Sequence, residues 1–147
     1  MKVVLDTNVL IDGFRDDYSY EKQIIDEIRT GKIEAYANRQ TLQENKLILG
    51  RLVDNPKYER ELNDFFSQIT MVVNRRNIRV VRDPEDNKIL ESAVEASAEF
   101  LITKDSDLLG LKKYENIEMI TPQAFWVRYQ DEGTDLWQQW AGFISGK

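Results

Sequence analysis

Carboxylate side chains recur beside apolar segments at four separate places in this chain. Asp6 and Asp105 each follow a short apolar, strand-forming run, Asp86 opens a helix-forming segment, and Glu44 lies within another. Right-handed crossovers bring the carboxyl ends of parallel strands to one edge of a sheet, so these acids can converge. Carboxylates at close range stay ionised together only when a cation neutralises them. The pattern therefore predicts a site for divalent metal ions, which activate water and hold a scissile phosphate.

Each of these acids also has an interpretation that involves the fold alone. An acid at the start of a helix can cap the free N–H groups there and favours the helix dipole. Asp6 or Asn8 would do this for the segment that follows the first strand, and capping is compatible with a role in a site. Spacing alone leaves both interpretations open.

The absence of two residue types limits the chemistry further. The chain has no histidine, which is the commonest general base and metal ligand, and no cysteine. Hydrolysis would then depend on carboxylates, lysines, hydroxyls or an oxygen-bound metal. Mg²⁺, Mn²⁺ and Ca²⁺ suit such ligands, whereas zinc suits them poorly. Zero cysteines exclude disulfides and fit a cytoplasmic protein.

The composition is that of a globular protein with one substantial core. The chain has 147 residues, of which 41% are hydrophobic and 31% charged, and its net charge is −6. No apolar run approaches the roughly 20 residues that a membrane span needs, so no membrane association is expected. The first residues predict a strand and not a signal peptide, because the apolar run ends at Asp6. Four acids gathered around a metal would account for much of the charge, so acidity does not exclude nucleic acid as a partner.

Hydrophobic periodicity predicts alternating strands and helices. Strands are expected at 3–5, 33–37, 78–81, 100–103 and 117–120, and helices at 10–15, 18–30, 39–52, 57–73, from about 89 to 96, and from Pro122 onward. Alternation of this kind implies an α/β fold whose parallel sheet is covered on both faces. We expect one domain over residues 1–130.

The tail at 131–147 has a different character. After Gly133, Thr134 or Asp135 can cap a short helix with an apolar stripe that includes Trp137 and Trp140. This stripe can pack on its own domain, or it can form a surface for a second copy or a partner, because tryptophan is enriched at interfaces.

Four stretches of the chain resemble the motifs of the PIN-domain family, and in particular its VapC-like group of toxin components from toxin–antitoxin systems. These stretches are Val3–Leu10, Thr41–Glu44, Asp83–Leu90 and Leu101–Leu109. Ile120–Phe125 also resembles the closing segment of the family. The resemblance covers about residues 1–126 and leaves the tail outside.

The resemblance implies a three-layer α/β/α sandwich with a short central parallel sheet and an Mg²⁺- or Mn²⁺-dependent endoribonuclease site. The acids at the family's catalytic and metal-binding positions are Asp6, Glu44, Asp86 and Asp105. An apolar residue usually follows the family's glutamate, whereas Asn45 stands here.

Neighbouring polar residues could orient these carboxylates or a water through hydrogen bonds. They are Thr7, Asn8, Thr103 and Asp107, and the last of them can also cap a helix.

Several cations lie near these acids in sequence and could contact RNA phosphates. They are Arg79, Arg82, Lys88 and Lys104, with Arg75 and Arg76 close by. If 78–81 is a strand, Arg79 and Arg82 point to opposite faces and cannot line one groove together.

Three hypotheses about function remain. The first is a ribonuclease toxin inhibited by a protein antitoxin, with a homodimer as its form in solution. The second is an RNA-processing nuclease without an antitoxin, and the third is a non-catalytic binding module. An aspartyl-phosphate enzyme or receiver fits poorly, because Asn8 stands where the phosphatase pattern has a second acid and Thr121-Pro122 where a receiver has lysine.

Overall fold

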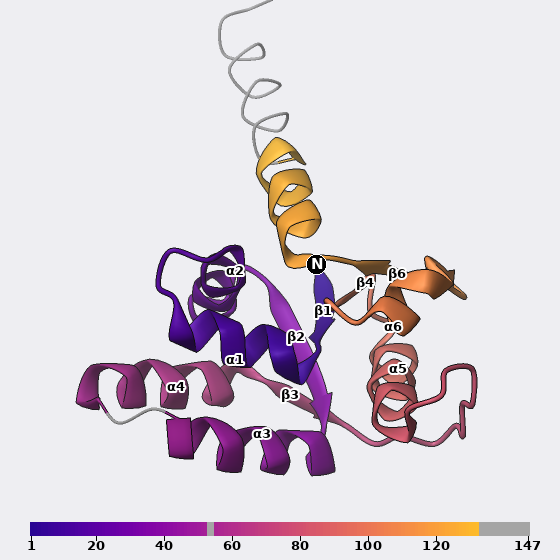
Figure 1. Ribbon diagram of the computed structural model, residues 1–147, viewed down its shortest axis with the longest axis horizontal. Helices are drawn as coiled ribbons and strands as arrows, with labels where there is room; N and C mark the ends of the chain where they lie inside the picture. The colour runs from indigo at the N-terminus through magenta and orange to yellow at the C-terminus, as the bar shows by residue number, and fades with distance from the viewer. Residues whose placement is uncertain (53–54, 133–147) are drawn as a thin grey trace, which may run out of the picture.

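The computed structural model describes residues 1–52 and 55–132 of the chain. Strands and helices alternate along it as the sequence predicts (Figure 1). The strands are β1 (Lys2–Leu5), β2 (Glu34–Asn38), β3 (Thr70–Val72), β4 (Phe100–Ile102), β5 (Lys113–Tyr114) and β6 (Ile117–Ile120). The helices are α1 (Thr7–Arg15), α2 (Tyr20–Arg29), α3 (Arg39–Leu52), α4 (Pro56–Gln68), α5 (Pro84–Ala96) and α6 (Ser106–Leu111), followed by one at residues 122–132.

The strands form one sheet in the order β3-β2-β1-β4-β6-β5. All neighbours are parallel except β5 and β6, which form an antiparallel pair at one edge. In the register of the two central strands, Val3 pairs with Phe100 and Leu5 with Ile102. The carboxyl ends of β1 and β4 therefore lie side by side, and the segments with Asp6 and Asp105 leave the sheet there.

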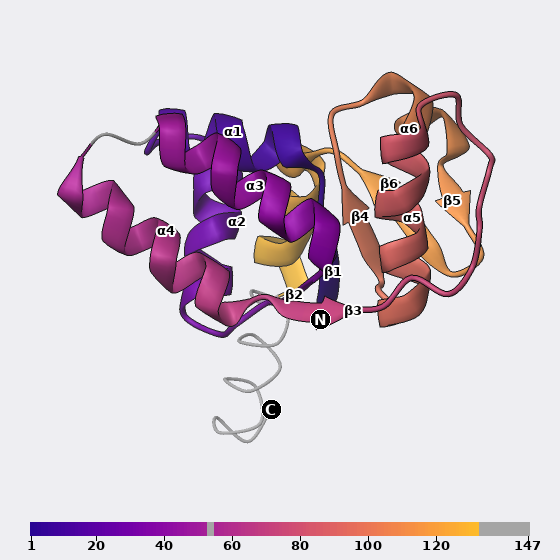
Figure 2. The same ribbon diagram turned by 90° about the horizontal axis from the view of Figure 1, so that it is seen from below.

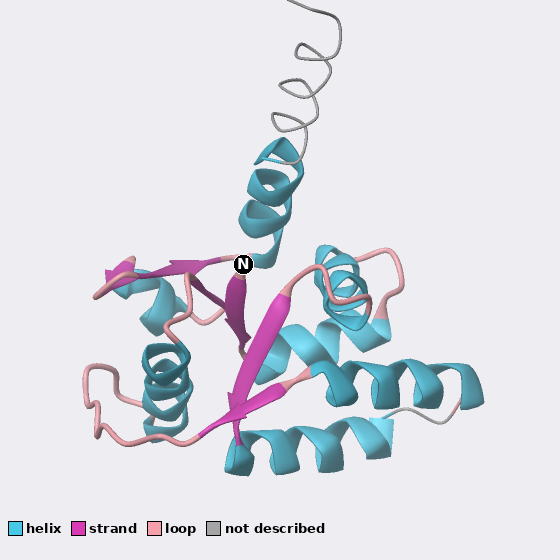
Figure 3. Ribbon diagram, turned by 180° about the vertical axis from the view of Figure 1, so that it is seen from behind, coloured by secondary structure: helices cyan, strands magenta, loops and turns pink. Residues whose placement is uncertain are grey.

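Helices cover both faces of the sheet, which confirms the three-layer α/β/α architecture (Figure 2). Seen from behind, the strands form a twisted layer between the helices (Figure 3). Alternate residues of β1 enter two separate cores, because side chains of a strand point to opposite faces in turn. Val3 and Leu5 pack with α1, α2, α3, α4 and Phe125, whereas Val4 packs with α5, α6 and Ile117.

The predicted strand at 78–81 is wrong, and the third strand is β3 instead. The predicted helix at 57–73 ends at Gln68, and the chain then pairs with β2 through Thr70–Val72. Residues 73–83 form a loop that passes beside α5 before the helix begins (Figure 2).

Side chains of α5 bind the backbone of this loop, which explains why no strand forms. Asn87 Oδ1 accepts hydrogen bonds from the N–H groups of Val80 and Val81, both at 3.1 Å, and Asn87 Nδ2 donates to Val81 O at 2.8 Å. Glu91 Oε1 accepts from the N–H of Ile78 at 2.8 Å. These bonds satisfy backbone groups that a strand would otherwise pair with a neighbour. Of the β-branched residues in this loop, Ile78 is buried in the core, and none of them pairs with a neighbouring strand.

The helix predicted to open at Thr121-Pro122 is present over residues 122–132. The expected tail helix after Gly133 lies outside the described residues, so the division at residue 130 stays a prediction. No helix in the described ranges combines the length and apolar character needed to cross a membrane.

Candidate active site

Asp6 lies at the carboxyl end of β1, where the chain turns into α1. Its side chain is buried, with 5% of its surface exposed, and its N–H donates to Ile102 O of β4 at 3.0 Å. Thr103 Oγ1 donates a hydrogen bond to Asp6 Oδ2 at 2.8 Å. The carboxylate does not cap α1 through a side-chain hydrogen bond, although the nearby amides of Thr7 and Asn8 favour its charged form and oppose the rise in its pKa. Capping therefore does not account for an acid buried at this position.

Asp105 is both a helix cap and a neighbour of Asp6. Its Oδ1 accepts hydrogen bonds from the N–H groups of Asp107 at 2.9 Å and Leu108 at 3.0 Å, which caps α6. The N–H of Asp105 donates to Thr103 Oγ1 at 3.0 Å. One threonine hydroxyl thus connects the backbone of Asp105 to the carboxylate of Asp6. Asp105 remains partly exposed, so its carboxylate is also accessible to a ligand.

Asp86 lies in the first turn of α5, which is capped by Asp83 and begins at Pro84. It is buried, with 8% of its surface exposed, and no hydrogen bond to its carboxylate is found within residues 1–52 and 55–132. Burial, followed by repulsion from Asp105 and Asp6, raises the pKa of Asp86 from 3.8 to about 7. Burial also raises the pKa of Asp6, with a contribution from Asp105. The three acids therefore interact electrostatically although they come from three separate elements.

This mutual repulsion indicates what the site is suited to bind. Among the described residues, no three acidic side chains lie close enough, as positioned, to enclose a metal ion. The donors are nevertheless carboxylates, of which Asp6 and Asp86 are buried and have a raised pKa, and a divalent cation relieves this condition. Oxygen donors alone match Mg²⁺ or Mn²⁺ and not zinc. Asp6, Asp86 and Asp105 therefore fit such an ion in their chemistry.

The structure does not bring Glu44 into this group. Its side chain is exposed on α3, and its nearest polar partner is Gln40, whose Nε2 lies 3.5 Å from Glu44 Oε1. The next residue, Asn45, is buried, and its Oδ1 accepts a hydrogen bond from Thr7 Oγ1 at 2.9 Å. Asn45, which the sequence analysis did not assign to the site, is thus the side chain of α3 that contacts the turn after β1.

The remaining polar residues expected near the acids have different environments. Thr103 is fully buried and bonds to both Asp6 and Asp105, as described above. Thr7 is bonded to Asn45, whereas Asn8 is exposed. Asp107 is exposed at the start of α6 and contributes to the raised pKa of Asp86.

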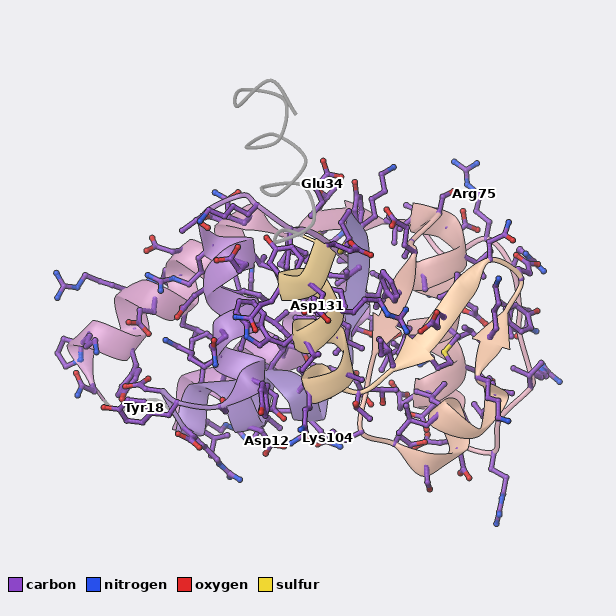
Figure 4. All side chains as sticks on the ribbon, turned by 90° about the horizontal axis from the view of Figure 1, so that it is seen from above. Asp12, Tyr18, Glu34, Arg75, Lys104 and Asp131 are labelled. Carbon is purple, nitrogen blue, oxygen red and sulfur yellow. The ribbon has the colours of Figure 1, made fainter. Side chains whose placement is uncertain are left out.

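The predicted RNA-contacting cations also divide into two kinds. Lys104 Nζ forms ion pairs with Asp12 at 2.9 Å and Glu21 at 2.5 Å, so its charge is used within the protein. Figure 4 shows Asp12 and Lys104 next to each other at the surface. Lys88 Nζ lies 3.1 Å from Glu85 and 3.4 Å from Gln40 Oε1.

Arg79 and Arg82 are both exposed, and both line one hollow with Lys88. The prediction that they face opposite sides is wrong, because 78–81 is not a strand.

A buried polar network behind the acids was also missed by the sequence analysis. Asn38 Oδ1 accepts from the N–H of Thr41 at 2.8 Å, and Asn38 Nδ2 donates to Ser92 Oγ at 2.8 Å. Ser92 Oγ lies 3.0 Å from Asn74 Oδ1. The network joins the end of β2, the start of α3, the loop and α5. One signal was available, because Asn38 directly follows a predicted strand and precedes a predicted helix, where asparagine caps well.

Comparison with known proteins agrees with this architecture. The family described as PIN domain matches residues 2–107, so the chain belongs to the PIN-domain family. Its fold is therefore of the nuclease type, and RNA binding and divalent metal binding are general properties of such domains.

An uncharacterized protein of Methanocaldococcus jannaschii, MJ1680, is 32% identical over 143 aligned positions, which cover 85% of this chain and 89% of that protein. No solved structure shows significant similarity to the chain.

Proposed function

We propose that the protein is a divalent-metal-dependent endoribonuclease. The observation that supports this most directly is the electrostatic coupling of Asp6, Asp86 and Asp105, which are contributed by the ends of β1 and β4 and the start of α5. A bound Mg²⁺ or Mn²⁺ would supply an activated water and stabilise charge on the phosphodiester. Asp6, Asp86 and Asp105 would hold it. Glu44 would join them only by a change of its exposed side chain on α3.

The protein's own groups prepare this site in defined ways. The Thr103 hydroxyl donates a hydrogen bond to Asp6 Oδ2, so the other carboxylate oxygen, Oδ1, can face a ligand. The capping bonds to Asp105 Oδ1 occupy one oxygen of that side chain and leave Oδ2 available. Thr7 and Asn45 hold the turn after β1 against α3. Two of the carboxylates are thus fixed in direction before any ion binds, which lowers the cost of ordering them.

The test is cleavage of a labelled single-stranded RNA by the purified full chain with Mg²⁺, with Mn²⁺ and with a chelator. The variants Asp6→Asn, Asp86→Asn and Asp105→Asn are each expected to lose at least about 100-fold in rate, an effect of the size seen when one preorganised electrostatic group is removed. Asp131→Asn, an exposed acid of the helix at 122–132, is the matched control. Wild-type protein that cleaves equally well in chelator, or an Asp6→Asn variant as active as the control, would refute the proposal.

We further propose that this nuclease is the toxin of a toxin–antitoxin pair in the cytoplasm, with a protein antitoxin and a homodimeric form. The support is the resemblance of four stretches to the VapC-like group. Expression of the full chain is expected to arrest growth of a bacterial host, and co-expression of a small reading frame adjacent to its gene is expected to restore growth. Growth that is unaffected by the active protein would refute the toxin role and leave the nuclease proposal standing.

A further inference from the structure

Two neighbouring hollows lie along α5, and Asp86 in its first turn is not among the residues that line them. The first, of about 460 Å³, is lined by Arg79, Arg82, Pro84 and Lys88, among others. The second, of about 390 Å³, is lined by Arg39 and also by Lys88 and Glu91, which the two hollows share. The shared residues make the two hollows neighbours between the loop at 73–83, α5 and the start of α3, and we consider them together as one groove. We call it the α5 groove.

The conformation of the loop explains why its arginines face the same groove. The N–H groups of Val80 and Val81 both bond to Asn87 Oδ1, so the backbone turns toward α5 instead of extending. The alternation of side chains that a strand would impose is therefore absent, and Arg79 and Arg82 line one hollow.

The charge of this groove is unusual for a protein with a net charge of −6. Arg29, Arg76 and Arg128 each form ion pairs with nearby acids. Within residues 1–52 and 55–132, by contrast, Arg39, Arg79 and Arg82 have no acid within 4.0 Å, and all three are exposed. Unpaired guanidinium groups that converge on one groove favour an anionic ligand, because guanidinium matches phosphate oxygens with two parallel hydrogen bonds.

The one acid within the groove does not cancel this charge. Glu91 Oε1 accepts the N–H of Ile78 at 2.8 Å, and Glu91 Oε2 accepts from Asn74 Nδ2 at 3.4 Å. Both oxygens are thus used to fasten the loop, and Glu91 is buried, with 8% of its surface exposed. The exposed charged side chains that line the groove are therefore all arginines, namely Arg39, Arg79 and Arg82.

We propose that the α5 groove binds the sugar–phosphate backbone of single-stranded RNA and directs it toward Asp86. This rests on the proposed nuclease function. Pro84 and Lys88, which both line the groove, lie two residues before and two residues after Asp86 at the start of α5. Hollows of a few hundred Å³ accept a ligand about the size of one nucleotide, so the groove suits a single strand and not a duplex. None of the groove's lining residues is aromatic, so base stacking does not contribute and the groove contacts the backbone.

The experiment compares Arg79→Gln/Arg82→Gln with Lys57→Gln/Arg60→Gln, which removes the same charge from the exposed side of α4. Binding of a fluorescein-labelled single-stranded RNA is measured by anisotropy in metal-free buffer over a range of salt concentrations. Two lost phosphate contacts make the salt slope less negative by about 1.4 and weaken binding about 25-fold at 0.1 M salt. The α4 control keeps the slope of the wild-type chain. Thermal unfolding of both variants checks that the fold is retained.

Cleavage measured alongside separates this inference from the proposed function. With Mn²⁺, the groove variant is expected to raise KM about 25-fold with little change in kcat, because its arginines hold RNA and do not touch the acids. Binding and KM that equal those of the control, in a wild-type chain that cleaves RNA, would refute the groove and leave the nuclease. Groove-dependent binding by a wild-type chain that cleaves nothing would refute the nuclease and leave the groove. Displacement of RNA by poly-glutamate at equal charge would overturn the RNA assignment in favour of an acidic protein partner.

Discussion

Replacement of Asp86 by asparagine is expected to stabilise the metal-free protein, which is unusual for a change at a candidate active site. Asp86 is buried and has a pKa raised from 3.8 to about 7, chiefly by burial and then by Asp105 and Asp6. A pKa difference of about 3 units corresponds to about 4 kcal/mol between the protonated and ionised forms. Because 8% of the side chain stays in contact with water, we expect roughly 2–4 kcal/mol of added stability in Asp86→Asn above neutral pH.

The sign of the pH dependence follows from the direction of the shift. The folded protein holds the Asp86 proton more tightly than the unfolded chain, so the stability linked to this group is fully present below about pH 4. It is lost as the pH rises through about 7. Urea unfolding of the wild-type chain without metal should therefore show a decrease in the free energy of unfolding between about pH 4 and about pH 8. In Asp86→Asn this decrease should be smaller by roughly 2–4 kcal/mol.

Added Mn²⁺ should reverse the order of the two proteins. A ligand at about 1,000 times its Kd stabilises the folded state by about 4.1 kcal/mol, which is enough to offset the advantage of the variant, and only the wild-type chain has the full set of carboxylates. Asp131→Asn, which alters an exposed acid, should follow the wild type in both experiments. An Asp86→Asn variant that is less stable than wild type in chelator at about pH 8, or that gains as much stability from Mn²⁺, would refute the reasoning.

Three further changes test the surroundings of the acids. Thr103→Val removes the hydroxyl that bonds Asp6 and the N–H of Asp105, so the free energy of unfolding should fall by about 1–3 kcal/mol and kcat should fall too; an unchanged kcat would contradict the orienting role. Asn45→Ala leaves the Thr7 hydroxyl without its partner and should cost about 1–3 kcal/mol in urea unfolding, whereas equal stability would show that water replaces it. Glu44→Gln alters an exposed side chain and should reduce cleavage far less than Asp6→Asn; an equal loss would show that Glu44 moves into the site when RNA binds.

The alternation of strands and helices was predictable because each element carries its own hydrophobic period. The ends of β1 and β4 were predictable for the same reason, and these ends place Asp6 and Asp105. The loop at 78–81 could not be predicted from the local sequence, because its β-branched residues favour a strand. What decides against it is the binding of its backbone by Asn87 and Glu91 from the following helix, and such side-chain contacts leave no periodic signal.

The exposed position of Glu44 in the structure follows from the phase of the apolar residues on α3. Residues of a helix advance by about 100° each, so Leu42 and Leu49, seven positions apart, share one face. Asn45 falls between them on that face, and Glu44 falls away from it, at about 200° from Leu42. The structure agrees, because Leu42, Asn45 and Leu49 are buried and Glu44 is exposed. The phase of the apolar residues on α3 therefore determines which polar residue faces the turn after β1.

The loop at 73–83 and the exposed position of Glu44 both affect how RNA would reach the site. A strand at 78–81 would have separated Arg79 and Arg82, and a Glu44 turned inward from α3 would have added a negative charge there. Instead the loop brings both arginines to the groove at the start of α5, while α3 presents the neutral Asn45 to the turn after β1. Exposed acids also lie near this site, because Asp83 and Asp107 contribute to the raised pKa of Asp86. If the proposed function holds, Arg79 and Arg82 would hold RNA phosphates, and a divalent ion would be needed to bring one phosphate to the acids.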